Sequence, residues 1–173
     1  VEHKGHLIFL DGQRSLTGFR DYYVKAILYK TSAPVVAAWV LAGLVPAATS
    51  RVRWLVPVAL AGLVLGVFSF SGYTLGLRYP LVFFPLVCVA TGRLAAPGPA
   101  ARTRAGMGLA VVLLAATDLW SVYPYPRAYV DRLVVRRPPF EALADMDLDW
   151  GEGLVALGEY VKAHGLGPIA LSY

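Results

Sequence analysis

The sequence has little charge and almost no cysteine or histidine. Only 16% of its 173 residues are Asp, Glu, Lys or Arg, against about 25% in an average soluble domain. One cysteine, Cys88, excludes an internal disulfide, and its place in an apolar run predicts a small packing residue. The histidines, His3, His6 and His164, are dispersed along the chain. No metal site is therefore predicted from them.

Apolar residues make up 57% of the chain. They gather in four stretches, 33–48, 54–70, 79–96 and 105–122. A helix needs about 20 residues, within a range of about 17 to 25, to cross the apolar core of a bilayer. Flanking tyrosines and tryptophans extend these stretches into the interface. We therefore predict an all-α polytopic membrane bundle of about four transmembrane helices; a soluble bundle is the alternative, with too few polar residues to coat it.

The net charge of +5 is carried by arginines in short connections, which is not the stripe that a nucleic-acid surface would need. The first connection carries Arg51 and Arg53, and the third carries Arg93, Arg102 and Arg104 without an acid. Because cytoplasmic loops are rich in Lys and Arg, both connections are expected on the cytoplasmic side. Both ends of the chain are then expected on the extracytoplasmic side, in a multi-pass protein of the inner (plasma) membrane.

Segments on either side of the transmembrane domain, residues 33–123, are more polar. In residues 1–32 the spacing of Phe19, Tyr23, Ile27 and Lys30 predicts a helix on the outer membrane surface, or the start of the first span. Residues 124–173 begin with a proline-rich turn, and "DLDWGEGLVALGEYVKAHG" follows as a helix that ends at Gly165. "PIALSY" predicts a strand. This tail is expected to be the start of a small extracytoplasmic α/β domain, truncated because both chain ends look cut.

Three stretches resemble the bacterial members of the dolichyl-phosphate-mannose–protein mannosyltransferase superfamily, which includes the aminoarabinose transferases and has the GT-C fold. They are "FLDGQRSLTGFRDYYVKAILYKTSAPVV", "GLRYPLVFFPLVCVATGRLA" and "YPYPRAYVDRLV" followed by "DMDLDWGEGLVALGEYV". The chain departs from the family pattern at Glu152, where the family has Gln, and at Asp131, where it has Asn. Ser32 and Ala33 also displace the proline that follows "KT".

The resemblance implies an integral membrane glycosyltransferase that moves a sugar from a polyprenyl-phosphate carrier to a glycan, lipid or protein acceptor on the extracytoplasmic face. The family's catalytic acid lies in its first outer loop, so it is expected upstream of this chain, which alone is expected to be inactive. A non-enzymatic membrane component of polysaccharide assembly or transport is the alternative. An oligosaccharyltransferase subunit is disfavoured by the order and place of "DWG". No organic cofactor is expected.

Arg78 is the first candidate for the donor phosphate, because Arg can hold phosphate through two parallel charge-assisted hydrogen bonds. Its neighbour Tyr79 belongs to the same resemblance, and Lys30 and Lys25 are further candidates. The alternative for each basic residue is an anchor in the lipid headgroups. Asp118 lies near the outer end of the fourth stretch, beside aromatic residues that indicate interfacial depth, so a structural role is favoured for it.

The acidic motif at the start of the tail helix consists of Asp147, Asp149, Trp150, Gly151 and Glu152. Asp147 or Asp149 can cap the helix, where a negative charge is stabilising. Trp150 can dock the first turn onto the membrane domain. Paired carboxylates can also bind a divalent cation. We favour capping and docking, so this motif is interpreted as a structural junction.

Overall fold

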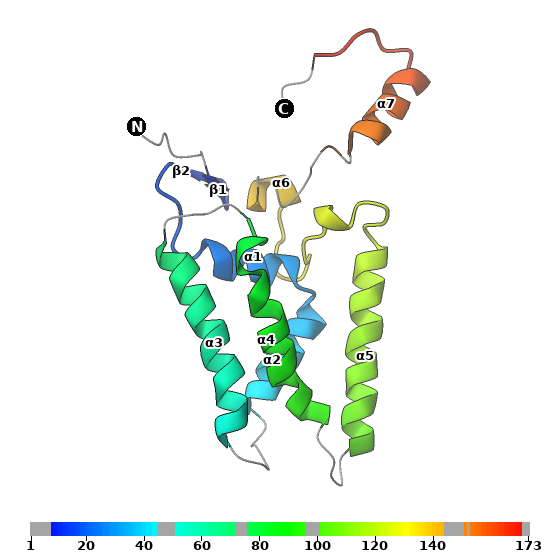
Figure 1. Cartoon of the computed structure of the whole chain (residues 1–173). Helices are drawn as coiled ribbons and strands as arrows, with labels where there is room; N and C mark the ends of the chain where they lie inside the picture. The colour runs from blue at the N-terminus through cyan, green and yellow to red at the C-terminus, as the bar shows by residue number, and fades with distance from the viewer. Residues whose placement is uncertain are drawn as a thin grey trace.

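The computed structural model describes residues 8–44, 51–71, 76–95, 101–143, 151 and 153–170. Four helical segments run side by side along one direction (Figure 1). They are α2 (Ala33–Leu44), α3 (Arg51–Phe70), α4 (Phe83–Thr91) between the 3₁₀ turns η1 (Tyr79–Val82) and η2 (Gly92–Ala95), and α5 (Ala101–Trp120). These segments coincide with the four apolar stretches of the sequence.

The remaining elements gather at one end of this bundle, which we call the polar end (Figure 1). Helix α1 lies across it and bends by 115° into α2. The elements of the polar end are β1 (Ile8–Leu10), β2 (Gln13–Ser15), α1 (Tyr22–Lys30), η3 (Pro126–Ala128) and α6 (Pro139–Ala142). Helix α2 does not continue the direction of α1. The N-terminal segment therefore contains a separate helix, and α1 and α2 can form one span only as a broken one.

The prediction of about four transmembrane helices is wrong. Among the described residues only α5 is long and apolar enough to cross a membrane, or two spans qualify if α1 and α2 are counted as one broken span. The described part of helix α2 has 12 residues, which at 1.5 Å each reach about 18 Å, against about 30 Å of apolar bilayer. Among the described side chains, the apolar part of α3 is Leu55–Phe70 and that of the third segment is Tyr79–Thr91. Among the described residues, length and composition therefore support one candidate crossing, or two with the broken helix, and do not support four.

Interruptions of helical geometry explain why the third segment is short. Pro80, the second residue of η1, has non-helical torsion angles, φ −83° and ψ 22°, and the regular helix begins only at Phe83. Proline is tolerated in the first turn of a helix, where its missing N–H would have no helical partner, so Pro80 marks the start of this segment. The hydropathy of residues 79–96 depends only on side-chain type. It therefore does not show where along this stretch the regular helix begins.

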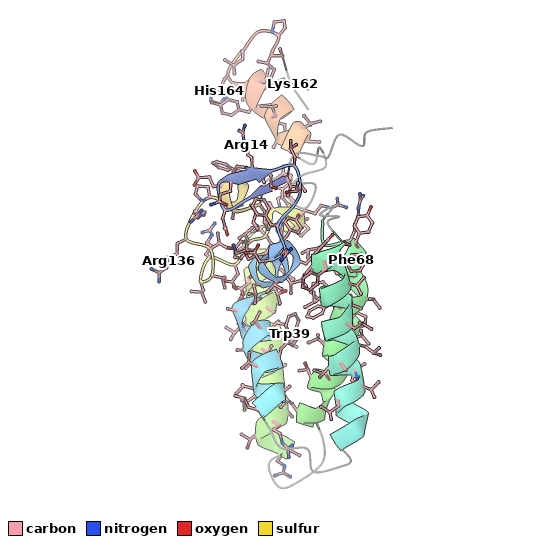
Figure 2. The ribbon with its side chains drawn as sticks, turned by 90° about the vertical axis from the view of Figure 1, so that its left-hand side faces the viewer. Arg14, Trp39, Phe68, Arg136, Lys162 and His164 are labelled. Carbon is pink, nitrogen blue, oxygen red and sulfur yellow. The ribbon has the colours of Figure 1, made fainter. Side chains whose placement is uncertain are left out.

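Buried side chains concentrate at the polar end and between α1, α3 and α4. One cluster centres on Leu10, Tyr22, Tyr23 and Leu143, which are 0–1% exposed. A second contains Ile27, Ala61 and Phe83, and its partly buried neighbour Trp39 lies between the helices, 5.8 Å from the ring of Phe83 (Figure 2). Helix α5 by contrast has no buried residue.

A short hairpin fixes the start of the polar end. Strands β1 and β2 pair antiparallel through a turn in which Asp11 and Gly12 have φ of 52° and 81°. Positive φ at both turn positions favours Asp-Gly and matches the twist of a two-residue hairpin. The backbone N–H of Asp11 donates to the carbonyl of Ala142, and Leu10 bridges Leu143. The hairpin thereby holds α6, which lies 130 residues later in the chain, against the bundle.

The predicted α/β tail is not found as such. Helix α7 (Gly153–Ala163) ends as expected, because Gly165 has φ 59° and the N–H groups of Gly165 and Leu166 donate to the carbonyls of Lys162 and Val161. This pattern is a Schellman motif. Of the predicted strand, residues 168–170 are not in a strand, and residues 171–173 lie outside the described residues. The two-stranded sheet in the described part of the chain is instead the N-terminal hairpin.

Candidate functional site

A basic hollow lies at the polar end, where the chain leaves α5. We call it the arginine hollow, after Arg132, Arg136 and Arg137. Its volume is about 380 Å³, and no acidic residue lines it. The other lining residues are apolar: Val122, Ala128, Val130, Val135, Pro138 and Pro139. The hollow therefore combines positive charge with apolar walls.

One tight turn places these arginines on the outside. The carboxylate of Asp131 accepts hydrogen bonds from the backbone N–H of Leu133 at 2.8 Å and of Val134 at 3.3 Å, and the N–H of Val135 donates to the Asp131 carbonyl. This is an Asx-type turn. It buries Asp131 and Val135 and leaves Arg132 and Arg136 exposed.

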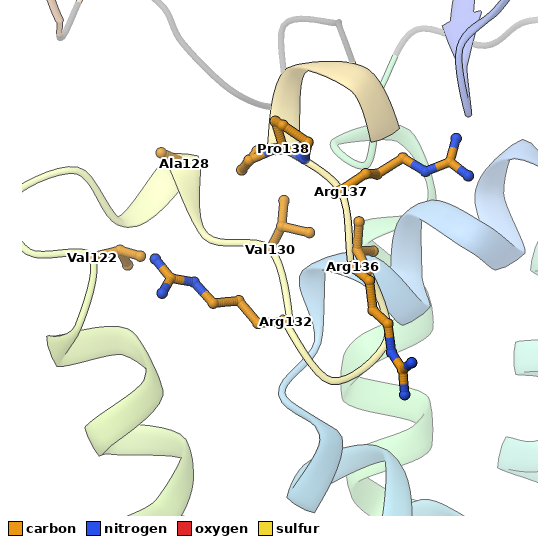
Figure 3. Close-up of a pocket in the computed structure, with 9 residues that line it drawn as sticks. Val122, Ala128, Val130, Arg132, Arg136, Arg137 and Pro138 are labelled. Carbon is orange, nitrogen blue, oxygen red and sulfur yellow. The ribbon is translucent and has the colours of Figure 1, made fainter.

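The three side chains do not converge on one point. Arg132 extends across the hollow towards Val122, whereas Arg136 and Arg137 line the opposite wall with their guanidinium groups turned away (Figure 3). Arg136 projects outward from the polar end (Figure 2). Across the described residues none of the three has a carboxylate partner, because the ion pairs found there join Lys25 to Asp11 and Asp21. Their charges are thus open to an anion from outside.

Asp131 is also the centre of a buried polar cluster beside the hollow. Its carboxylate accepts from the backbone N–H of Ala33, the first residue of α2, and from the hydroxyl of Tyr129 at 3.4 Å. Its own N–H donates to the carbonyl of Tyr29. Burial, and next the charge of Asp131, raise the pKa of Tyr129 to about 12. The cluster therefore ties α1, α2 and the segment after α5 together, and keeps the Tyr129 phenol protonated.

Asp118 takes part in the same junction. Its carboxylate accepts a hydrogen bond from the hydroxyl of Ser32, which lies between α1 and α2. Asp118 is therefore a link between α5 and the start of α2. This geometry agrees with the structural role expected for it.

Arg78 and Tyr79 lie at the start of η1. The guanidinium of Arg78 stacks over the Tyr79 ring, 5.1 Å from its centre, and both side chains are exposed. Within the described ranges Arg78 has no carboxylate partner. Its charge is therefore available to an anion, as the sequence interpretation requires. Tyr79 supports it from one side through a cation–π contact.

The two lysines are engaged elsewhere. Lys25 pairs with Asp21 at 2.7 Å and Asp11 at 2.9 Å, and hydrogen bonds to these carboxylates, Asp21 first, raise its pKa. The same contact with Lys25 lowers the pKa of Asp21. Lys30 donates to the backbone carbonyl of Arg127 at 2.5 Å. Lys25 is thus held by two carboxylates. Lys30 contacts the Arg127 carbonyl, whereas Arg78 contacts the Tyr79 ring, so the two residues do not share a partner among these contacts.

Most of the acidic motif before α7 cannot be placed. Asp147, Asp149, Trp150 and Glu152 lie outside the described residues. Gly151 is described: it has φ 90°, and its carbonyl accepts from the N–H of Leu154 in the first turn of α7. A left-handed conformation at this position favours glycine. The motif therefore includes a turn that leads into the helix.

No metal site is seen among the described residues, where no three His, Cys, Asp or Glu side chains lie close enough to hold an ion. His164 instead stacks on Tyr160, with ring centres 4.0 Å apart. Cys88 is exposed, although a packing role was expected for it.

The arginine hollow was not predicted from the sequence. The signal was present, because three arginines fall within six residues just after the last apolar stretch, and two prolines follow.

Comparisons of the chain with known protein families, with curated proteins and with solved structures found no match.

Proposed function

We propose that this chain is part of an integral membrane glycosyltransferase, which transfers a sugar from a polyprenyl-phosphate carrier to an acceptor on the extracytoplasmic face. The resemblance of "FLDGQRSLTGFRDYYVKAILYKTSAPVV", "GLRYPLVFFPLVCVATGRLA" and "DLDWGEGL" is the reason for this class of reaction. The catalytic acid would belong to a part of the enzyme that precedes this chain.

The exposed apolar surface of the helices supports the membrane setting. Helix α5 crosses the length of the bundle with none of its apolar window buried. Large apolar side chains are more than half exposed on α3 and α5, among them Leu55, Leu63, Leu109, Val112 and Leu113. Water would leave this surface unfavourably hydrated, and monomeric soluble proteins rarely expose apolar patches of such extent. Lipid is the cover that fits helices of this kind.

The observation that carries the proposal is the pairing of this apolar surface with unpaired arginines at one end. A carrier lipid presents its phosphate at the level where the acyl chains stop. Arg78 directly precedes η1 and has no carboxylate partner within the described part of the chain, and we infer that it lies at this level. A guanidinium at that position can bind the donor phosphate and stabilise the charge that develops on it as the sugar departs.

The orientation forms part of the proposal. The first turn of α5 carries Arg102 and Arg104 and no acid, at the end of the bundle opposite the polar end. The tendency of basic residues to face the cytoplasm places that end inside and the polar end outside. The arginines of the hollow oppose this tendency. Labelling of Arg14→Cys in a Cys88→Ala background with a membrane-impermeant thiol reagent tests the orientation. We expect labelling in intact cells, and labelling only after the cells are opened would place the polar end in the cytoplasm.

Sugar transfer by membranes that contain the full-length protein tests the function. Arg78→Ala is compared with the wild type and with Arg14→Ala, which removes an exposed arginine of the hairpin instead. Loss of one such electrostatic contact typically lowers turnover about 100- to 1,000-fold. We expect that loss for Arg78→Ala alone, at matched expression.

Two results would contradict the proposal. Equal turnover by Arg78→Ala and the wild type would reduce Arg78 to a headgroup anchor. No transfer by the wild type from any of several polyprenyl-phosphate sugars would favour the non-enzymatic component of polysaccharide assembly or transport.

A further inference from the structure

The arginine hollow lies at the boundary where the lipid-facing surface of α5 ends. Trp120, the last residue of α5, stacks with Tyr123, with ring centres 5.7 Å apart, and the two side chains are 77% and 74% exposed. Exposed Trp and Tyr side chains of membrane proteins gather at the headgroup level. Val122, between them, lines the hollow. The hollow is therefore at the depth of the lipid phosphates.

Within the described ranges, no carboxylate pairs with the arginines of the hollow. Asp131 directly precedes Arg132, but its carboxylate points into the polar cluster and accepts from Ala33, Leu133 and Val134. The Asp131 carboxylate is therefore occupied by hydrogen bonds that fix the turn, although it is the acid nearest to Arg132 in the sequence. Three arginines within six residues repel one another, and a bound anion would offset this repulsion.

The form of the hollow suits an anionic group that is joined to an apolar one. A volume of about 380 Å³ exceeds what a free phosphate needs, and valines and prolines line much of the wall. Arg132 already reaches across it (Figure 3). Arg136 and Arg137 have exposed side chains, whose long stems can turn their guanidinium groups towards an anion.

We propose that the arginine hollow is a binding site for the phosphate group of a membrane lipid, held by Arg132 with Arg136 and Arg137 as supporting cations. The site is distinct from Arg78 and does not depend on sugar transfer. The same chemistry serves a carrier lipid that ends in a phosphomonoester and an ordinary anionic phospholipid.

Lipid retention by the full-length protein tests this site. The purified protein in neutral detergent micelles is incubated with decaprenyl phosphate, with phosphatidylglycerol, with decaprenol as the uncharged control, or with inorganic phosphate. Bound lipid is counted by native mass spectrometry, and binding curves are taken by titration. The variants are Arg132→Gln, the double variant Arg132→Gln/Arg136→Gln, Arg132→Lys and Arg14→Gln. Arg14 matches the loss of one exposed charge at the polar end, outside the hollow.

We expect the wild type and Arg14→Gln to retain a phosphate lipid and to release decaprenol. Because a hydrogen bond to a charged group contributes about 1.5–3 kcal/mol, Arg132→Gln should weaken binding about tenfold to a hundredfold. The double variant should lose more, and Arg132→Lys should retain part of the affinity, which also shows that the position tolerates change. Stronger retention of decaprenyl phosphate than of phosphatidylglycerol identifies a carrier-lipid site, and the reverse identifies a phospholipid site.

Three results would overturn the proposal. One is equal retention by the wild type and the double variant, with both folded. Another is an effect of Arg14→Gln as large as that of Arg132→Gln, which would mean attraction by general surface charge. The third is competition by inorganic phosphate as strong as by either lipid, which would mean a site for soluble anions. Since binding is measured without turnover, failure of this proposal and failure of sugar transfer are separate results.

Discussion

Replacing Asp131 by Ala should destabilise the polar end more than any other single removal of a carboxylate there. Asp131 is 3% exposed. Its carboxylate accepts from the backbone N–H groups of Ala33, Leu133 and Val134 and from the hydroxyl of Tyr129. The substitution removes the acceptor from the start of α2 and from the turn that presents Arg132 at the same time.

The size of the effect follows from these contacts. Loss of the acceptor at the first N–H of α2 costs about 1–2 kcal/mol, as for other N-terminal caps. The N–H groups of Leu133 and Val134 belong to exposed residues, which water can reach, so each costs about 0.5–1 kcal/mol. The total expected for Asp131→Ala is about 3 kcal/mol of unfolding free energy. Asp131→Asn keeps one acceptor oxygen and should cost about 1 kcal/mol.

The assay is reversible unfolding of the full-length protein in mixed micelles, followed by circular dichroism. Asp21→Ala is the control, because Asp21 is an exposed carboxylate in an ion pair with Lys25 and such pairs contribute at most about 1 kcal/mol. If Asp131→Ala were no more destabilising than Asp21→Ala, the reasoning that Asp131 joins α2 to the segment after α5 would be refuted.

Three further predictions concern other parts of the described chain. The pKa of Tyr129 is raised to about 12 in the fold, against about 10 when exposed. The stability that the protonated Tyr129 phenol contributes is therefore complete below pH 10 and is lost between pH 10 and 12. Tyr129→Phe should flatten the decline in unfolding free energy over that interval; an unchanged slope would contradict the burial argument. Gly165→Ala should cost about 1 kcal/mol at the end of α7, since φ is 59°, and should speed amide exchange at residues 161–166, whereas Gly158→Ala in the helix interior should not. Lys25→Met should cost about 1 kcal/mol of stability through its lost ion pairs and leave the KM for the sugar donor unchanged; a large rise in KM would instead restore Lys25 as a donor-phosphate residue.

Local patterns account for the parts of the fold that were predicted correctly. The helical spacing from Phe19 to Lys30 identified α1, whose buried residues are Tyr22, Tyr23, Ala26 and Ile27. Gly165 identified the end of α7. In both cases the deciding interactions join residues within a few positions of each other, so that the pattern is visible along the chain.

The number of membrane-spanning helices could not be judged from apolar content. Residues 79–96 look like one apolar segment, but regular helix is limited to Phe83–Thr91. Apolar composition does not report where torsion angles leave the helical region. For α3 the two agree, because the predicted apolar stretch 54–70 and the observed helix Arg51–Phe70 end at the same residue.

By itself the sequence determined that most of this chain is apolar helix, that α1 is a helix separate from the apolar stretches, and that α7 ends before Gly165. These properties follow from side-chain hydropathy, periodicity and glycine conformation, which act over short distances in the chain. Only the tertiary structure decided that Asp131 binds the N–H of Ala33, 98 residues earlier, and that Arg132 is thereby turned into a hollow beside the end of α5. Such pairings depend on which segments pack together, and no local pattern encodes them.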